Sequence, residues 1–164
     1  MKYWRVMLKH DGNNKAAECM RADYIGVDTA IFEDVSDYLS GGWGKFRRRF
    51  KPDYMKNRPD RESIGAGRSL ASLWKIAKVM VPGDIVLSPD GDKFYASEIV
   101  SGGYYYAKER EKRGLFHCRP VKWSGKEIPR NDMPGTMPKG AGRATVVNVS
   151  KYAEDIKQLL GDTD

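Results

Sequence analysis

The dipeptide Asp90-Gly91, which lies between two apolar runs, is the feature that most restricts how this chain of 164 residues can fold. Asp-Gly favours the two-residue loop of a β-hairpin, because both residues readily adopt the backbone conformation that such a loop requires. We therefore predict that a strand over residues 84–88 pairs with a strand over residues 94–100. Pro82-Gly83 comes directly before the first strand and marks the end of a preceding helix.

Hydrophobic periodicity indicates the other strands. Residues 3–9 alternate between apolar and polar side chains, which is the pattern of a half-buried strand. Residues 24–27, 115–123 and 144–149 predict further short strands. Six or seven short strands with two helices in one domain predict the α+β class, with a curved sheet or a small barrel of about six strands.

Two helices are expected. Apolar residues at spacings of three and four predict a helix that begins near Ser69 and runs to about Met80. Trp74 lies on the apolar face of this helix and is expected to be a core residue. A last short helix is predicted over residues 151–160, with Ser150 as its N-cap and Gly161 at its end.

The composition excludes several classes of protein. Hydrophobic residues make up 40% of the chain and charged residues 31%, as in a globular protein, and we expect one domain over residues 1–164. No apolar run approaches the ~20 residues of a membrane helix, and residues 1–10 lack the apolar block of a signal peptide, so we expect a cytoplasmic protein without a membrane partner. Cys19 and Cys118 lie far apart, and the chain has only two histidines. We therefore expect free thiols, no metal and no cofactor.

Positive charge is concentrated in one part of the chain. The net charge is +7, and residues 45–68 contain nine basic residues against three acidic ones. Residues 40–68 show no clear hydrophobic period, so we predict a long basic loop inserted at the binding face. Such a concentration is typical of proteins that bind a polyanion, but a solvated loop without a partner has the same composition.

The segment SGGWGKFRRRF, residues 40–50, puts a tryptophan among three glycines. Glycine loses more conformational entropy on ordering than any other residue, so Trp43 is poorly placed to be an ordinary core residue. We expect its ring to face an open pocket. The alternative is that Trp43 folds back onto Phe46 and Phe50 as a small separate core.

The chain offers little for catalysis. His10 and His117 stand in none of the motifs that combine a histidine with a metal or a general base, and each is expected to be a surface or hydrogen-bonded histidine. Gly65-Ala66-Gly67 is not followed by the Lys-Ser/Thr of a phosphate-binding loop. We therefore expect a binding domain and not an enzyme.

Several motifs, taken in order, resemble a known group of domains. The basic stretch with Trp43 is followed by a helix, by Pro82-Gly83-Asp84 and a strand that ends at Ser88, by the hairpin and by an aromatic edge. The string Arg-Pro-Val-Lys-Trp, residues 119–123, then precedes Lys-Glu-Ile-Pro-Arg, residues 126–130. Together these motifs resemble the PUA-like superfamily, and within it the EVE and YTH domains, over most of residues 1–150. EVE-like domains of this pattern are attached to modification-dependent restriction enzymes.

The resemblance implies a small, partly closed mixed β-barrel with flanking helices, in which aromatic side chains hold a modified base. Carried over to this sequence, it implies that the base is bound by Trp43 with Gly42, by Ser88, and by Tyr104, Tyr105 and Tyr106. The phosphates beside the base would be bound by basic side chains of the loop and of the following helix. These candidates are Lys45, Arg47, Arg48, Arg49, Lys51 and Arg68.

These features predict a DNA-binding specificity module. It would flip a modified base of the 5-methylcytosine type out of double-stranded DNA into an aromatic cage, and would direct a nuclease subunit or a fused nuclease domain to that site. One alternative is a reader of N6-methyladenine in DNA or RNA, as YTH relatives are. Alternatives of another class are a protein-interaction module whose basic loop binds an acidic partner, and a small enzyme that acts on nucleic acid.

Overall fold

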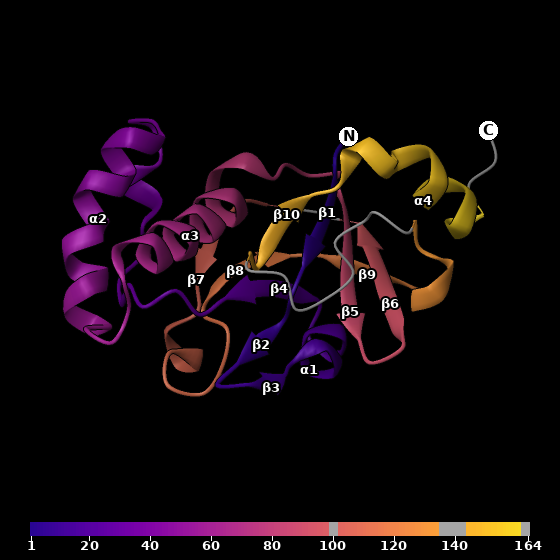
Figure 1. The fold of residues 1–164 in the computed structure, drawn as a ribbon, viewed down its shortest axis with the longest axis horizontal. Helices are drawn as coiled ribbons and strands as arrows, with labels where there is room; N and C mark the ends of the chain where they lie inside the picture. Colours follow the sequence, from indigo (N-terminus) through magenta and orange to yellow (C-terminus); the bar gives the residue numbers. More distant parts are fainter. Residues whose placement is uncertain (99–101, 135–143, 162–164) are drawn as a thin grey trace.

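The computed structural model describes residues 1–98, 102–134 and 144–161 (Figure 1). The α-helices in these residues are α1 (Ala16–Arg21), α2 (Trp43–Asn57), α3 (Ser63–Trp74) and α4 (Ala153–Leu160). The strands are β1 (Tyr3–Val6), β2 (Lys9–His10), β3 (Asn13–Asn14), β4 (Tyr24–Val27), β5 (Ile85–Asp90), β6 (Lys93–Glu98), β7 (Tyr105–Tyr106), β8 (His117–Pro120), β9 (Lys122–Pro129) and β10 (Val146–Asn148). A π-helix, Lys75–Val79, continues directly from α3.

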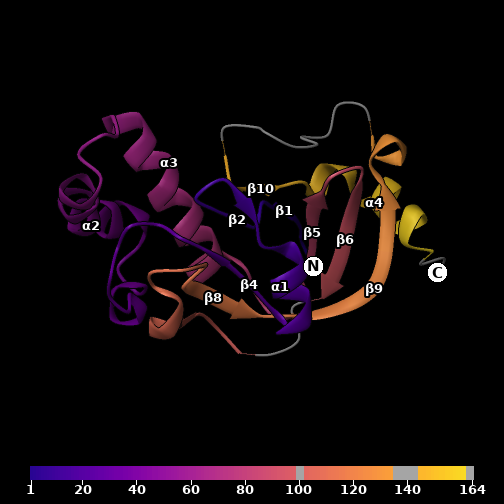
Figure 2. The same cartoon turned by 90° about the horizontal axis from the view of Figure 1, so that it is seen from below.

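The largest sheet has five strands in the order β10-β1-β5-β6-β9. Strands β1 and β5 run parallel, and every other neighbouring pair in this sheet is antiparallel. The N-terminal strand β1 therefore lies inside the sheet, between two strands that come much later in the chain. Figure 2 shows β9 curving past β6 towards the end of the molecule where α4 lies.

A second sheet is formed by β4, β8 and β7, and β2 pairs with β3. Helices α2 and α3 pack together at one end of the molecule, and α4 lies at the other end (Figure 1). The sheets are open in the part of the chain that the structure describes. The predicted α+β class is confirmed.

The predicted hairpin is present in β5 and β6. Leu87 pairs with Ala96, and Asp90 pairs with Lys93 across the turn. Gly91 has a φ of 61°, in the left-handed region that glycine adopts without strain. The predicted second strand extends to residue 100, and its end falls in residues 99–101, outside the described residues.

Two hydrophobic cores lie on opposite faces of the five-stranded sheet. Successive residues of a strand point to opposite faces, so Val86 enters the main core and Leu87 enters the smaller one. In β1, Trp4 likewise enters the main core and Tyr3 enters the smaller one. The main core extends to the buried faces of α2 and α3, whereas the smaller core is covered by α4.

The prediction of a long loop over residues 40–68 is wrong. Most of this segment forms α2 and the first half of α3, joined by a short connection. Phe46, Phe50 and Tyr54 recur at intervals of four, which brings them to one side of a helix, and all three are buried. Burial of this apolar stripe stabilises the helix by more than the low helix propensity of the glycines destabilises it, and the glycines cluster at the beginning of the helix. Gly42 directly precedes α2 with a φ of 82°, a conformation that favours glycine.

The other predicted elements agree with the structure in part. The described residues form four α-helices where two were expected, and the strand predicted over residues 115–123 is two strands, β8 and β9, in different sheets. Helix α3 begins at Ser63, six residues before the predicted start, and the last helix ends at Gly161, whose φ is 77°. Cys19 and Cys118 are free and buried, as expected. Among the described residues, no helix is both long enough and apolar enough to cross a membrane.

Candidate nucleic-acid interface

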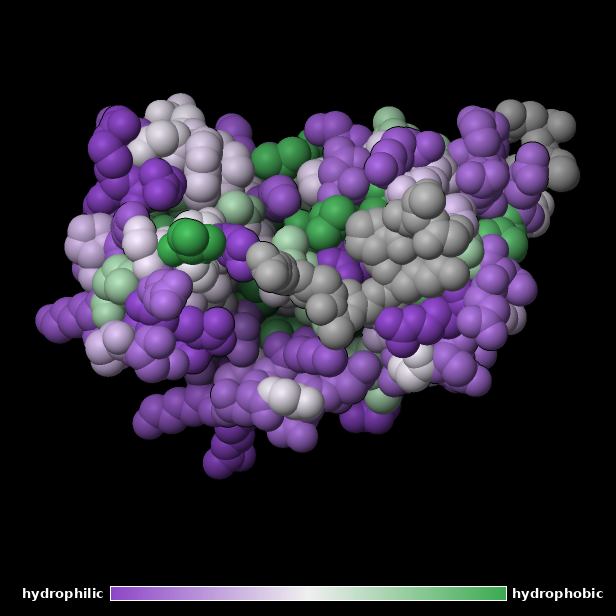
Figure 3. All heavy atoms as spheres, in the orientation of Figure 1, coloured by the Kyte–Doolittle hydropathy of each residue, from purple (hydrophilic) through white to green (hydrophobic). Residues whose placement is uncertain are grey.

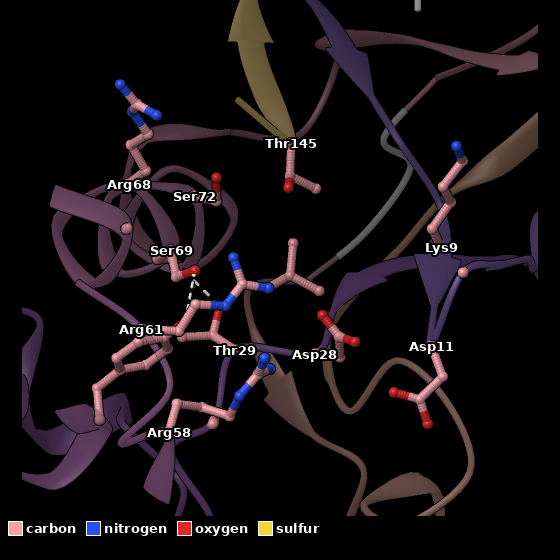
Figure 4. Close-up of a pocket in the computed structure, with 15 residues that line it drawn as sticks. Lys9, Asp11, Asp28, Thr29, Arg58, Arg61, Arg68, Ser69, Ser72 and Thr145 are labelled. Carbon is pink, nitrogen blue, oxygen red and sulfur yellow. Dashed lines mark hydrogen bonds between the residues drawn. The ribbon is translucent and has the colours of Figure 1, made fainter. Parts of the chain in front are cut away.

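A cavity of about 470 Å³ opens between α3 and the strands β2 and β4. We call this cavity the basic pocket. In the space-filling view, the face seen in Figure 1 has a hollow in this region that is bordered mainly by hydrophilic residues (Figure 3). The charged lining residues are Lys9, Asp11, Asp28, Arg58, Arg61 and Arg68 (Figure 4). The lining residues with hydroxyl groups are Thr29, Tyr54, Ser69, Ser72 and Thr145.

One side of α3 forms a wall of the basic pocket. Gly65, Ser69 and Ser72 follow one another at spacings of four and three, which brings them to the same side of the helix. Their small side chains leave space for a ligand. Hydrogen bonds fix this wall, because the Tyr54 and Ser69 hydroxyls lie 3.0 Å apart and the Thr29 hydroxyl donates to the Ser69 carbonyl oxygen at 3.2 Å.

Four cations surround the cavity. Arg58 forms an ion pair with Asp60 at 3.0 Å, and this contact raises the pKa of the Arg58 guanidinium above its ordinary value. Lys9, Arg61 and Arg68 form no ion pair within the described parts of the chain. An anionic ligand could therefore bind all three without breaking an ion pair.

Two carboxylates lie on the side of the pocket away from α3. Nδ1 of His10 lies 3.0 Å from the Asp28 carboxylate, and Nε2 of His10 lies 3.3 Å from the Asp11 carboxylate. A protonated imidazole can donate from both nitrogens, so His10 can link the two acids. In Figure 4 the Asp28 carboxylate points towards the interior of the pocket. Asp11 also lines the pocket, and its side chain is 82% exposed.

A buried hydrogen-bond chain supports the segment that continues from Asp28. Nε2 of His117 donates to the carbonyl oxygen of Ile31 at 2.7 Å, so Nδ1 is left to accept from the Tyr104 hydroxyl, also at 2.7 Å. The same hydroxyl accepts from the Val35 backbone N–H at 3.4 Å. Burial lowers the pKa of His117 to about 4, which favours the neutral ring. His117 is therefore a satisfied histidine, as the sequence indicates.

The C-terminal end of the helical wall is held by Arg119 of β8. Its guanidinium is buried and donates to the carbonyl oxygens of Ile76 at 2.8 Å, Ala77 at 3.0 Å and Gly102 at 3.2 Å. Ile76 and Ala77 belong to the π-helix that continues α3. The arginine of the Arg-Pro-Val-Lys-Trp string thus anchors the helix that lines the basic pocket, and does not itself reach the cavity.

The structure does not assemble the predicted aromatic cage. Trp43 is half-buried and packs against the main core, with its ring centroid 6.3 Å from that of Phe46 and 6.1 Å from that of Trp74. This packing matches the alternative in which the ring folds back on Phe46, and not the expectation of an open pocket. Gly42 is exposed at the start of α2. Ser88 is fully buried, and its hydroxyl has no hydrogen-bond partner among the described residues.

The three consecutive tyrosines lie on and beside β7, away from the lining of the basic pocket. Tyr104 belongs to the buried chain with His117. Tyr105 is exposed and accepts a 3.4 Å hydrogen bond from Arg110, whereas the Tyr106 hydroxyl donates to Glu111. The structure therefore gives each tyrosine a local partner and does not bring the tyrosines together with Trp43.

Among the predicted phosphate-binding residues, Arg68 lines the basic pocket. Arg47 and Arg48 are exposed on α2. Lys45 and Arg49 line a separate cavity of about 180 Å³ beside Tyr38.

Two of these residues already have partners in the protein. Arg49 forms ion pairs with Asp53 at 2.9 Å and with Glu33 at 3.2 Å, and Lys51 donates to the Ser63 hydroxyl at 2.5 Å. The Arg49–Asp53 pair lies within α2, whereas the contacts with Glu33 and Ser63 tie α2 to neighbouring segments. A phosphate would have to compete with these contacts.

The sequence reasoning missed Lys9, Asp28, Arg58 and Arg61 as pocket residues. The one signal for these arginines is the density of basic residues over residues 45–68, because Arg58 and Arg61 lie in the connection between α2 and α3 and not on a helix. No comparable signal marks Lys9 or Asp28, because only the tertiary fold brings β2 and the end of β4 next to α3.

Among the described residues, no group of three or more His, Cys, Asp and Glu side chains could hold a metal ion.

Comparison with known proteins places the chain in a family. A search of curated proteins finds no match. Residues 4–150 match the model of a domain of unknown function, DUF8426. Since the match covers most of the chain, this protein belongs to the DUF8426 family.

Proposed function

We propose that this domain is a nucleic-acid-binding specificity module that takes a nucleotide, swung out of double-stranded DNA, into the basic pocket. The observation that carries the proposal is the lining of the pocket, where three arginines and a lysine surround a cavity of about 470 Å³. Arg and Lys are the main side chains that contact nucleic-acid phosphates. The resemblance to EVE and YTH domains supports a modified base as the target, with 5-methylcytosine as the first candidate.

The pocket has room for a single nucleotide, since cavities that bind small ligands typically measure about 300–1,000 Å³. Flipping a nucleotide out of the duplex costs a few kcal/mol, so contacts to the base alone barely compensate and phosphate contacts must contribute. Lys9, Arg61 and Arg68 can supply these contacts without breaking an ion pair. A guanidinium plane can also stack on a base, and Arg61 is the candidate for this role.

We assign base reading to the basic pocket and not to a cage around Trp43. Ser88 is fully buried, and the half-buried ring of Trp43 packs against Phe46 and Trp74 of the main core, so neither residue lines an open cage. The exposed Arg47 and Arg48 of α2 remain candidates for contacts to phosphates that flank the flipped nucleotide.

We further propose that the domain binds and does not cut. A methyl group discriminates by only ~1–3 kcal/mol even in an apolar pocket, and the basic pocket is lined mainly by charged and hydroxyl-bearing residues. We therefore propose that the module depends on a nuclease subunit or a fused nuclease domain for its effect. The PUA-like resemblance supports the interpretation that the curved five-stranded sheet and the smaller sheet belong to a partly closed barrel. Such a module would act on DNA in the cytoplasm.

Binding to matched duplexes tests the proposal. Fluorescence anisotropy would compare duplexes that carry cytosine, 5-methylcytosine, adenine or N6-methyladenine at one position. The logarithm of the association constant falls with the logarithm of the salt concentration by about 0.9 for each phosphate neutralised. The double variant Arg61→Ala/Arg68→Ala is therefore expected to bind all duplexes more weakly and to reduce this slope by about 2.

Arg113→Ala is the matched control, because it removes an exposed arginine outside the basic pocket. It is expected to leave both the affinity and the slope nearly unchanged. A slope near zero for the wild-type protein would contradict the proposal and favour an acidic protein partner. Preference for N6-methyladenine would favour the alternative reader, and DNA cleavage by this chain alone with Mg²⁺ would contradict a role in binding only.

A further inference from the structure

The basic pocket contains a carboxylate that would repel a purely anionic ligand. Asp28 lies among Lys9, Arg58, Arg61 and Arg68 in the lining of the cavity. Its charge is near enough to Arg58 to help raise the pKa of that guanidinium, after the larger effect of Asp60. A phosphate placed beside Asp28 would be repelled, so this side of the pocket suits a ligand group that donates hydrogen bonds.

The position of the Asp28 carboxylate is fixed by the fold. Asp28 directly follows β4, whose Gly26 packs so closely on β8 that a Cβ atom there would lie 2.9 Å from the His117 carbonyl oxygen. His10 Nδ1 donates to Oδ2 of Asp28 at 3.0 Å. In the described chain the other oxygen, Oδ1, has no partner, and the carboxylate points into the pocket (Figure 4).

We propose that Asp28 determines specificity in the basic pocket by accepting a hydrogen bond from the exocyclic amino group of the flipped base. An ionised carboxylate only accepts hydrogen bonds. Cytosine, adenine and guanine each carry an exocyclic amino donor, whereas thymine and uracil carry no amino group and have only the ring N3–H, flanked by two carbonyl oxygens that a carboxylate repels. The pocket therefore prefers an amino-bearing base over thymine, uracil and their modified forms. This inference rests on the proposed function and narrows its substrate class.

The two sides of the pocket then have different tasks. The arginines beside α3 bind the phosphate and the acceptor atoms of the base, and Asp28 binds the amino group on the opposite side. His10 is a positioning residue, since it holds one oxygen of Asp28 and leaves the other facing the ligand. A ligand with both an anionic group and a hydrogen-bond donor fits this arrangement, and a nucleotide has both.

The test uses short duplexes with one unpaired cytosine, adenine, guanine or thymine, so that no base pair has to be broken before the base enters the pocket. We expect the wild-type protein to bind the duplexes with an amino-bearing unpaired base about tenfold more tightly than the thymine duplex, the range expected for one well-made base contact. Asp28→Asn replaces the carboxylate by an amide that can also donate. This variant is expected to bind all of these duplexes within about threefold of one another.

Asp155→Asn is the matched control, because it makes the same change in an exposed carboxylate of α4 that does not line the basic pocket. It is expected to keep the wild-type preference. The midpoint of thermal unfolding would show that both variants are folded. If Asp28→Asn is not folded, the proposed role of Asp28 is judged from the preference of the wild-type protein among the four unpaired bases.

The outcomes separate this inference from the function on which it rests. If the wild-type protein binds the duplexes with all four unpaired bases equally, or if Asp28→Asn keeps the preference, the role of Asp28 is wrong while the proposed DNA binding stands. If the wild-type protein binds no duplex, the proposed function itself fails.

Discussion

Nε2 of His117 donates a hydrogen bond to the backbone carbonyl oxygen of Ile31 across 2.7 Å, and the ring is completely buried. A carbonyl oxygen cannot donate, so the direction of this bond fixes the neutral tautomer with its proton on Nε2. The bond joins β8 to the segment that follows Asp28. The protonation state of one side chain therefore affects the segment next to the basic pocket.

Stability is expected to fall in mild acid because of His117. The pKa of His117 drops from an ordinary 6.5 to about 4 in the folded protein, so below 6.5 the unfolded chain binds a proton that the folded chain does not. Above pH 6.5 the neutral ring of His117 makes its full contribution to the free energy of unfolding. This contribution decreases by about 3 kcal/mol as the pH falls towards 4. Urea unfolding of the wild type and of His117→Gln across this range would measure it. An equal pH dependence in the two proteins would contradict the prediction.

Removing the hydroxyl of Tyr104 is expected to destabilise the fold. Tyr104→Phe leaves Nδ1 of His117 and the Val35 N–H without their partner, which costs about 1–3 kcal/mol in a buried site. Tyr105→Phe is the matched control, since its hydroxyl makes only weak contacts, with Arg110 at 3.4 Å and with the Cys118 thiol, and its loss should change the free energy of unfolding by about 0.5 kcal/mol. Urea unfolding of both variants would test the prediction, which fails if the two losses are equal.

Arg119→Lys is expected to lower stability despite the retained charge. The planar guanidinium donates to three carbonyl oxygens, and an ammonium group on a shorter side chain cannot reproduce that geometry. The expected loss is about 2–3 kcal/mol, measured by urea unfolding. Arg113→Lys, an exposed change of the same kind, should have almost no effect.

Trp43→Phe separates core packing from base stacking. The ring of Trp43 contacts Phe46 and Trp74, so its partial replacement is expected to cost about 1 kcal/mol of stability. DNA affinity, measured by anisotropy under conditions in which the variant is folded, should stay within about twofold of the wild type. A loss approaching the ~1–3 kcal/mol of a stacked base would restore the cage proposed from the sequence.

Local signals predicted the hairpin well. The turn at Asp90-Gly91 and the apolar runs on either side of it are adjacent in the sequence, so strands β5 and β6 follow from neighbouring residues alone. The failure over residues 40–68 has a different cause. Glycines and arginines there obscure the spacing of Phe46, Phe50 and Tyr54, although this spacing is visible once the three residues are compared with a helical period.

The basic pocket could not be predicted, since its lining comes from β2, the end of β4, the connection between α2 and α3, α3 itself and the start of β10. Arg68 was expected to bind phosphate from its place at a helix start, and it does line the cavity. Asp28 gave no signal, because only the pairing of β4 with β8 and the contact with His10 give it a defined position.

The central place of β1 has a consequence for the order in which the chain can be built. Its neighbours β5 and β10 begin 82 and 143 residues after Tyr3, so β1 leaves the ribosome long before either partner exists. Contacts between residues so distant in sequence slow folding, since a long loop must close before they form. Strand β1 therefore stays unpaired while at least 82 further residues are synthesised. We expect this strand to be the segment on which a ribosome-associated chaperone acts first.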